Sequence, residues 1–290
     1  MDSLDTATPS SALARARSFL FVPGIRPERF ARALASGADA VVLDLEDSVP
    51  ANAKQAAREA IRDAWADLGG AGAGVVLVVR INAPEGAWGA DDIEWLARLG
   101  RPAAVMVPKV ESADALDRVT TALPGIALLP LIESAAGYAT LPEIAAAAGV
   151  SRLVIGHIDF MADTGIQCSA GEPELASLRF AVAMATRLNR LAPAVDGVTV
   201  AIDDEAKLRE DTARALRFGF GAKLCIHPRQ VAIVHDVMAP SADDIDWAQR
   251  VIAADAAAGG AATQVDGRMV DLPVVLQARR TLARARLPES

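Results

Sequence analysis

The chain has 290 residues, of which 52% are hydrophobic and only 4% aromatic, so a core would be built from Ala, Val, Leu and Ile. This composition suits parallel strands that are covered by helices on both faces. With 29 basic and 37 acidic residues the formal net charge is −8, which excludes a broad basic surface for nucleic acid. The two cysteines, Cys168 and Cys225, are too few for a disulfide framework and fit a reducing compartment.

No stretch approaches the roughly 18 uninterrupted apolar residues that a membrane-spanning helix needs. The first residues contain Asp2 and Asp5 and lack the charged-then-apolar pattern of a signal peptide. We therefore expect a soluble, cytoplasmic protein without a membrane partner, in which residues 1–16 form a disordered tail.

From residue 17 onward, short apolar runs alternate with amphipathic segments of helical length. The apolar runs predict eight strands, at residues 18–22, 40–45, 75–81, 103–107, 127–132, 153–158, 197–201 and 223–226. Eight strand–helix repeats favour a closed TIM (β/α)8 barrel over an open doubly wound sheet. A dinucleotide-binding glycine fingerprint would follow a strand, whereas the glycine run at 69–74 precedes one.

The end of the chain departs from this repeat. Residues 241–258 have helical spacing, Gly259 and Gly260 interrupt it, and residues 271–286 predict another helix. We assign the barrel to residues 17–258. A closed barrel does not require residues 259–290, so we expect them to act as a lid or an oligomer contact.

Ionisable residues follow six of the eight predicted strands. In TIM barrels the chemistry takes place at the carboxyl ends of the strands. The residues at these ends are Asp44, Glu46, Asp47, Arg80, Lys109, Glu133, His157, Asp159 and His227. Each comes after several apolar residues, so each would lose its hydration unless it were paired or bound to a ligand. Their number predicts a functional site rather than one structural ion pair.

Glu133 and Asp159 end consecutive predicted strands, which lie about 4.8 Å apart in a sheet. Two carboxylates at that separation repel each other unless a cation or a proton lies between them. Two carboxylates completed by water and substrate oxygens are typical of Mg²⁺ sites, so we predict Mg²⁺ as the cofactor and these acids as its ligands. The alternative is that each acid caps the following helix or pairs with Lys109. The histidines show no zinc-ligand spacing.

Arg80 offers a planar fork that suits a substrate carboxylate. A salt bridge to Asp44 or Glu46 is the structural alternative, and the two roles can coexist. We expect Glu46 and Asp47 to accept hydrogen bonds from water around the metal, and Lys109 to support the acids electrostatically.

Two further residues have a structural as well as a functional interpretation. His227 is either a packed histidine at a strand end or a base. Asp271 begins the final predicted helix, where the role of N-cap already explains an aspartate.

With the strand ends assigned, the sequence resembles the citrate lyase β-subunit-like branch of the HpcH/HpaI aldolase family. The resemblance extends from residue 17 to about residue 286. It rests on six motifs in this order: SFLFVPG (18–24), DLEDSV (44–49), RIN (80–82), PKVES (108–112), IESAAG (132–137) and IHP (226–228). Each motif alone is weak, but the ordered set is specific.

The resemblance implies an Mg²⁺-dependent carbon–carbon lyase that cleaves or forms a short hydroxyacyl-CoA thioester, such as malyl-, citramalyl- or citryl-CoA, with a 2-keto acid and an acyl-CoA as the other partners. It implies Glu133 and Asp159 as metal ligands, with Glu133 also beside the substrate, and Arg80 as the residue that holds the substrate carboxylate. Asp271 would be the acid/base residue on a lid that closes over a neighbouring subunit's site, which implies a homotrimer or hexamer.

Several alternatives stay open at this point. The alternatives to a freestanding lyase are a citrate lyase β subunit that needs an acyl-carrier partner, a free keto-acid aldolase, a malyl-CoA-type thioesterase, and a non-catalytic protein that retains the barrel. The sequence also departs from the family pattern. His157 and Phe160 stand where acidic or small residues and Leu are commoner, and Ala222 stands where Gly is frequent. These departures bear on the substrate more than on the chemistry.

Overall fold

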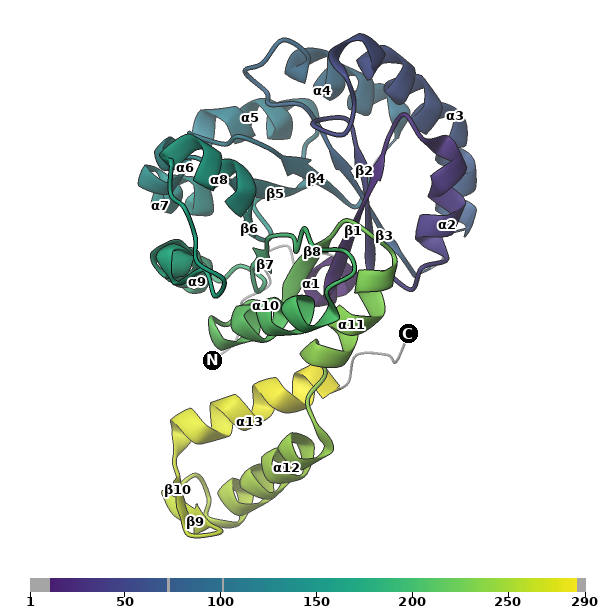
Figure 1. The fold of residues 1–290 in the computed structure, drawn as a ribbon. Coiled ribbons are helices and arrows are strands. Elements are labelled where there is room, and N and C mark those ends of the chain that lie inside the picture. Colours follow the sequence, from purple (N-terminus) through teal and green to yellow (C-terminus); the bar gives the residue numbers. More distant parts are fainter. Residues whose placement is uncertain (1–10, 72–73, 101, 286–290) are drawn as a thin grey trace. The chain divides into compact units, whose positions relative to one another are not determined.

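The structure is a computed structural model and describes residues 11–71, 74–100 and 102–285. Eight parallel strands form a closed barrel in chain order, with helices outside them (Figure 1). β1 pairs with β8 and thereby closes the sheet. The strands are β1 (Ser18–Pro23), β2 (Ala40–Asp44), β3 (Val76–Arg80), β4 (Ala104–Val107), β5 (Ala127–Ile132), β6 (Val154–Ile155), β7 (Val195–Asp196) and β8 (Ala222–Cys225). The predicted TIM-barrel fold is confirmed.

Helices and 3₁₀ turns connect the strands. They are α1 (Ser11–Arg15), η1 (Pro27–Arg29), α2 (Phe30–Leu34), η2 (Ala51–Ala53), α3 (Lys54–Ala71), α4 (Gly89–Leu99), α5 (Ala113–Ala122), α6 (Ala135–Ala139), α7 (Leu141–Ala146), α8 (His157–Thr164), η3 (Pro173–Leu175), α9 (Ala176–Leu188), α10 (Glu205–Arg217) and α11 (Arg229–Met238). None of the helices in the described part of the chain is long and apolar enough to cross a bilayer.

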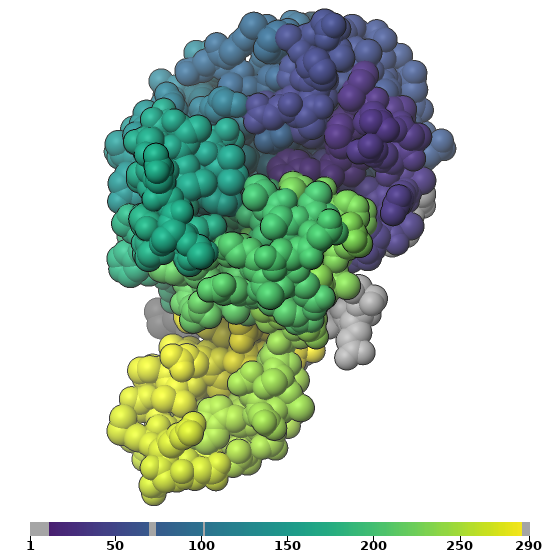
Figure 2. Space-filling model, viewed as in Figure 1, coloured from purple at the N-terminus to yellow at the C-terminus, as the bar shows by residue number. Residues whose placement is uncertain are grey.

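Alternate residues of each strand fill the interior of the barrel. Ala40 and Val42 of β2, like their counterparts on the other strands, belong to one buried cluster. Because side chains alternate between the two faces of a strand, the residues that continue this inward series at the carboxyl ends are Asp44, Arg80 and Glu133. In the space-filling view the barrel unit is hollowed where its purple, teal and green parts meet (Figure 2).

Two of the predicted strands differ from the structure. β6 ends at Ile155, and residues 157–164 form α8 instead of continuing the strand. The strand predicted at 197–201 is wrong, because β7 is Val195–Asp196 and the chain then leaves the sheet. Gly197 explains this exit, since its backbone packs against His157 and its carbonyl oxygen accepts a 2.7 Å hydrogen bond from Lys223 Nζ.

The predicted N-terminal tail also needs correction. Residues 1–10 of that tail lie outside the described residues, but residues 11–15 form α1. Leu13 and Ala16 are buried in the cluster that fills the barrel, so this segment is part of the folded core. The reason is the burial of these apolar side chains. The prediction of a tail rested on the acidic residues at the start of the chain and did not take this burial into account.

The chain divides into two compact units, one up to residue 235 and the other from residue 236. The second unit contains α12 (Ala242–Ala257), a hairpin of β9 (Thr263–Val265) and β10 (Arg268–Val270), and α13 (Leu272–Ala285). This division comes earlier than the boundary at 258/259 that the sequence suggested. The physical reason is that Val251 of α12 shares a small buried core with Val275 of α13.

Candidate active site

Arg80 and Asp44 lie opposite each other on β3 and β2. Nε and Nη2 of Arg80 donate to the two oxygens of Asp44 at 2.6 and 2.7 Å, and Nη1 lies 2.8 Å from Oε2 of Glu46. The ring of Phe21 covers the guanidinium at 4.7 Å. A guanidinium has five N–H groups, of which the hydrogen bonds to Asp44 use two, while the contact with Glu46 is an ion pair. The salt bridges form, and Arg80 can still bind a carboxylate.

The charges of Asp44, Glu46 and Arg80 shift one another's pKa values. Burial alone would raise the pKa of Asp44, but the charge and hydrogen bonds of Arg80 hold it below its ordinary value. Burial raises the pKa of Glu46, and the charge of Arg80 offsets only part of that rise. Burial would lower the pKa of Arg80, but Asp44 and Glu46 raise it, so the guanidinium stays charged.

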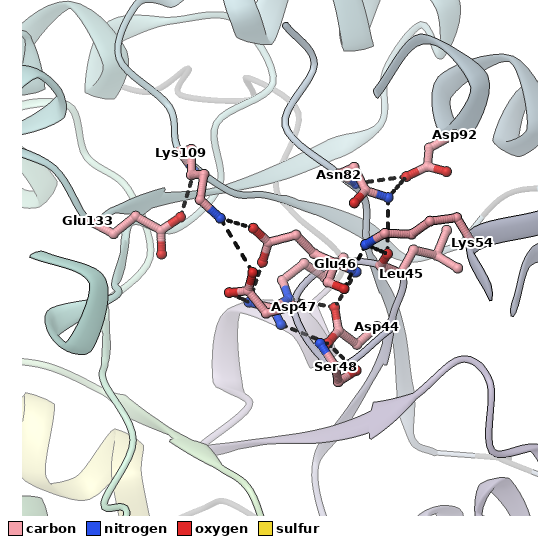
Figure 3. Close-up of polar contacts among 11 residues, drawn as sticks. Asp44, Leu45, Glu46, Asp47, Ser48, Lys54, Asn82, Asp92, Lys109 and Glu133 are labelled. Atoms are coloured by element: carbon pink, nitrogen blue, oxygen red, sulfur yellow. Dashed lines mark hydrogen bonds and ion pairs between the residues drawn. The ribbon is translucent and has the colours of Figure 1, made fainter. Parts of the chain in front are cut away.

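Lys109 joins the same cluster from the end of β4. Its Nζ pairs with Glu46 and lies 3.5 Å from Oδ1 of Asp47 (Figure 3). Burial would lower the pKa of this lysine, but Glu46 and then Asp47 raise it. The side chain therefore adds a positive charge beside the two acids. The backbone N–H of the same residue donates a hydrogen bond to Glu133.

Glu133 is only 3% exposed and follows the last residue of β5. Its Oε1 accepts a 2.6 Å hydrogen bond from the backbone N–H of Lys109, whereas its Oε2 is buried and has no hydrogen-bond partner among the described residues. A Cβ atom at Gly156 would lie 2.3 Å from that Oε2, so only glycine permits this approach. Burial, the charge of Glu46 and, to a smaller extent, that of Asp159 raise the pKa of Glu133 to about 8.

Asp159 lies in the first turn of α8 and not at the end of a strand. Its side chain is partly exposed. The helix that carries it begins beside Glu133, because Gly156, the N-cap of α8, lies against Oε2 of Glu133, and the charge of Asp159 raises the pKa of that residue. Neither acid is a helix cap, since the N-caps of α6 and α8 are Ser134 and Gly156.

The buried, unpartnered Oε2 of Glu133 and the carboxylate of Asp159 provide anionic oxygens for a hard cation. In the described ranges there is no group of three or more His, Cys, Asp or Glu residues that could hold a metal ion. Mg²⁺ keeps several waters and is commonly bound by one or two carboxylates together with substrate oxygens. The residues present therefore fit Mg²⁺ rather than a site built entirely from side chains.

A second layer of buried side chains lies behind this cluster, and sequence reasoning did not single it out. Lys54, at the start of α3, reaches the loop after β2, and Asn82 and Asp92 approach the same loop from beyond β3 and from α4 (Figure 3). Asp92 is fully buried although it lies in the first turn of an amphipathic helix. The sequence signals for this layer are a charged residue on the apolar face of that helix and the place of Asn82 in the RIN motif.

The two histidines predicted at strand ends lie at the starts of helices. His227 Nδ1 accepts a 3.2 Å hydrogen bond from the backbone N–H of Arg229 at the start of α11, and burial lowers its pKa. His157 is buried as the first residue of α8 and packs on Gly197. His157 lies two residues before Asp159, so a residue that departs from the family pattern is next to the candidate metal site.

Asp271 belongs to the second unit. Its Oδ1 accepts a 3.4 Å hydrogen bond from the backbone N–H of Val274 at the start of α13, as an N-cap does. Asp271 is partly exposed in this position.

The fold and the site define a TIM-barrel protein with a charged cluster at the end of the barrel where this fold carries active sites. Within that class, the chain belongs to the HpcH/HpaI aldolase/citrate lyase family, whose profile matches residues 17–228.

Similar proteins extend the match to nearly the whole chain. A citrate lyase subunit beta-like protein from Deinococcus radiodurans is 37% identical over 92% of this chain and 96% of its own length. A (3S)-malyl-CoA thioesterase from Cereibacter sphaeroides is 33% identical over 93% of this chain and 94% of its own. Among solved structures, the CitE protein of Mycobacterium tuberculosis in complex with magnesium, acetoacetate and coenzyme A has 36% identity and a TM-score of 0.79, and the match covers 94% of this chain and 99% of that one.

Proposed function

We propose that this chain is an Mg²⁺-dependent carbon–carbon lyase that cleaves or forms a short hydroxyacyl-CoA thioester of the malyl-, citramalyl- or citryl-CoA kind. The products of cleavage are a 2-keto acid and an acyl-CoA. Membership of the family and the relative solved with magnesium, acetoacetate and coenzyme A support the chemical class.

One observation carries the proposal: Glu133 keeps a buried oxygen without a hydrogen-bond partner among the described residues, against the N-cap of the helix whose first turn carries Asp159. Such an arrangement is unfavourable by itself, because two acids near each other repel and a buried acceptor loses its hydration. A cation held by Glu133 and Asp159 removes both penalties. Mg²⁺, when bound, would polarise the oxygens of a 2-oxo or 2-hydroxy acid.

The other residues bind and orient the substrate. The N–H groups of Arg80 that do not bond Asp44 would hold its carboxylate, and the fork is kept in place by Asp44 and Glu46. Lys109 balances the negative charge of the acids around the site and aims one oxygen of Glu133. The substrate would therefore be fixed with its reacting carbons near the acids.

The chemistry then consists of proton movements around one carbon–carbon bond. In cleavage, the substrate hydroxyl loses its proton, the bond to the α-carbon breaks, and its electron pair passes to the thioester, whose enolate takes up a proton at carbon. Asp271 is the residue proposed to donate that proton, and in synthesis to remove it. A lid formed by the second unit of a neighbouring copy, in a homotrimer or hexamer, would exclude water from the enolate.

The test is a screen of short hydroxyacyl-CoA thioesters with and without Mg²⁺, in which release of the 2-keto acid is followed. We expect release only with Mg²⁺ and not from the Glu133→Gln variant. Equal release after complete chelation of divalent metals would contradict the proposal.

A second candidate is hydrolysis of the thioester, which the relatives named (3S)-malyl-CoA thioesterase favour. Cleavage of malyl-CoA leaves the thioester bond intact and gives a 2-keto acid, whereas hydrolysis releases free CoA thiol and malate. A thiol reagent and a keto-acid assay on the same reaction therefore separate the two activities.

Two further candidate functions can be distinguished by the choice of substrate. The citrate lyase subunit beta of Escherichia coli is 34% identical over 93% of each chain, so a subunit that needs an acyl-carrier partner is a candidate. Such a subunit would be inactive alone on free citrate, and a free keto-acid aldolase would need no thioester.

A further inference from the structure

Two buried side chains behind the barrel mouth, those of Lys54 and Asn82, bind the backbone beside and at Glu46, and two more, those of Asp92 and Arg58, hold Asn82 in place. We call Lys54, Arg58, Asn82 and Asp92 the loop bracket. All four are less than one tenth exposed, and all come from segments outside the loop that they hold.

Lys54 makes the most direct contact. Its Nζ donates to the carbonyl oxygens of Leu45 and Glu46, both at 2.8 Å (Figure 3). Two successive carbonyl groups that point to one ammonium cannot follow the alternating pattern of a strand. The side chain therefore defines the turn by which the chain leaves β2.

Asn82 holds the same place from the other side. Its Nδ2 donates to the carbonyl oxygen of Leu45 at 3.0 Å and to Oδ2 of Asp92 at 2.6 Å. Asp92 also accepts from the backbone N–H of Asn82 at 2.7 Å and from Nη1 of Arg58 at 2.7 Å. The carboxylate of Asp92 thus fixes the direction of the Asn82 amide.

Glu46, whose backbone is held in this way, connects the two cations of the charged cluster. Glu46 is 4% exposed and pairs with both Arg80 and Lys109. Its own backbone N–H donates to Oδ1 of Asp44 at 2.9 Å. A displacement of its backbone would therefore move the partners on which Arg80 depends for its orientation.

We propose that Lys54 and Asp92 are positioning residues for this site. Lys54 fixes the backbone of Leu45 and Glu46 directly, Asp92 fixes that of Leu45 through Asn82, and through Glu46 both set the direction of Arg80. The kinetic part of this inference rests on the proposed function. A misplacement of about 1 Å at a catalytic site costs roughly 100-fold in rate, so the bracket matters even though none of its members faces the substrate.

The experiment compares Lys54→Met with Arg152→Met. Arg152 is a matched control, since it is a fully buried cation that holds the backbone carbonyl oxygens of Leu13, Ala16 and Pro193 at 2.6–3.0 Å, before β1 and β7 rather than after β2. Amide hydrogen exchange at Glu46 and Ser48 is measured in both variants. Steady-state kinetics with the best thioester follow.

In Lys54→Met we expect exchange at these two amides to accelerate roughly tenfold or more, since hydrogen bonds from a charged donor are lost. KM should rise by a similar factor, since Arg80 is no longer aligned, and Lys54→Arg should recover part of both losses. Arg152→Met should lower the melting temperature but leave the exchange at Glu46 and the KM unchanged. If Lys54→Met does not fold, Asp92→Asn replaces it, because it keeps the size of the side chain.

Unchanged exchange at Glu46 in a folded Lys54→Met or Asp92→Asn variant would overturn the inference, as would equal acceleration in Arg152→Met. An unchanged KM alongside faster exchange would overturn the kinetic part. If the wild-type protein released no keto acid from any thioester, the proposed function would fail, whereas the exchange data would still decide on the bracket.

Discussion

The backbone N–H of Lys109 donates a 2.6 Å hydrogen bond to Oε1 of Glu133 from a residue whose φ is +51°. A left-handed backbone at a residue with a side chain costs on the order of 1 kcal/mol. The chain thus adopts an uncommon conformation at the point where it aims a donor at one oxygen of a buried acid. The other oxygen stays buried and, among the described residues, without a hydrogen-bond partner, and it is the oxygen that we propose as a ligand of the cation.

If Glu133 and Asp159 hold Mg²⁺, each amide substitution should weaken binding of the ion. We expect Glu133→Gln and Asp159→Asn each to lower Mg²⁺ affinity by roughly tenfold or more, because a neutral amide replaces a hard anionic ligand. Turnover should fall at least as far. Titration calorimetry of the ion into each purified variant measures the affinity directly.

Asp163→Asn is the matched control for this titration, since Asp163 lies on the same helix as Asp159 and accepts a 2.7 Å hydrogen bond from the backbone N–H of Ala135. An asparagine keeps an acceptor there, so Mg²⁺ affinity should stay near that of the wild type. A loss in Asp163→Asn as large as in Asp159→Asn would mean that the effect is structural.

Glu133 should also make the metal-free protein sensitive to pH. Its pKa is about 8 in the folded state against an ordinary value of 4.5, so between these limits the folded state binds more protons than the unfolded state. The free energy of unfolding should therefore decrease as pH rises through this window. Denaturant titrations in chelator measure it, and added Mg²⁺ should reverse the decrease because the ion favours the ionised acid.

The Glu133→Gln variant isolates this contribution, because a glutamine does not titrate. We expect the wild type to lose stability relative to the variant as the pH rises from about 5 to about 8. Parallel curves for the two proteins would show that Glu133 is already ionised at the low end of the window.

The inward-facing members of the site were accessible from the sequence, because a strand obeys a period of two. Asp44, Arg80 and Glu133 each continue an apolar series on one strand face, and the structure brings Asp44 and Arg80 into direct contact. Asp159 was assigned to a strand end, and the error arose because an apolar run of a few residues does not distinguish a short strand from the first turn of a helix.

The loop bracket could not be found in the same way. Lys54 acts by donating to backbone carbonyl groups, and a carbonyl group is present at every position, so no residue spacing signals the contact. The charge of Asp92 is balanced by Arg58, which lies on a different helix. Only the packing of α3 and α4 on the barrel brings these groups together.

Arg80→Lys should separate charge from geometry. A lysine keeps the positive charge but cannot hold both oxygens of Asp44 and still present two donors to a substrate carboxylate. We expect KM to rise by about 10- to 100-fold, equivalent to the loss of one or two charge-assisted hydrogen bonds. Steady-state kinetics over a range of thioester concentrations measure the change.

Arg179→Lys provides the comparison, because Arg179 is also buried and forks between Asp196 at 3.1 Å and Glu172 at 2.7 Å. This variant should lose thermal stability while its KM stays near the wild-type value. A similar rise of KM in both variants would mean that Arg80 acts through the stability of the fold and not through substrate binding.

The proposed role of Asp271 depends on an arrangement between copies, and a mixture of two inactive variants can test it. Asp271→Asn should lower kcat by about 100-fold or more and leave Mg²⁺ affinity unchanged, because an amide cannot transfer the proton. In trimers assembled from equal amounts of Asp271→Asn and Glu133→Gln chains, about one site in four would combine an intact barrel with an intact neighbouring Asp271. We therefore expect co-refolded mixtures to recover about a quarter of wild-type activity, whereas mixtures made after separate folding stay inactive. If Asp271 served the barrel of its own chain, every site would lack one of the two acids, and no activity would return.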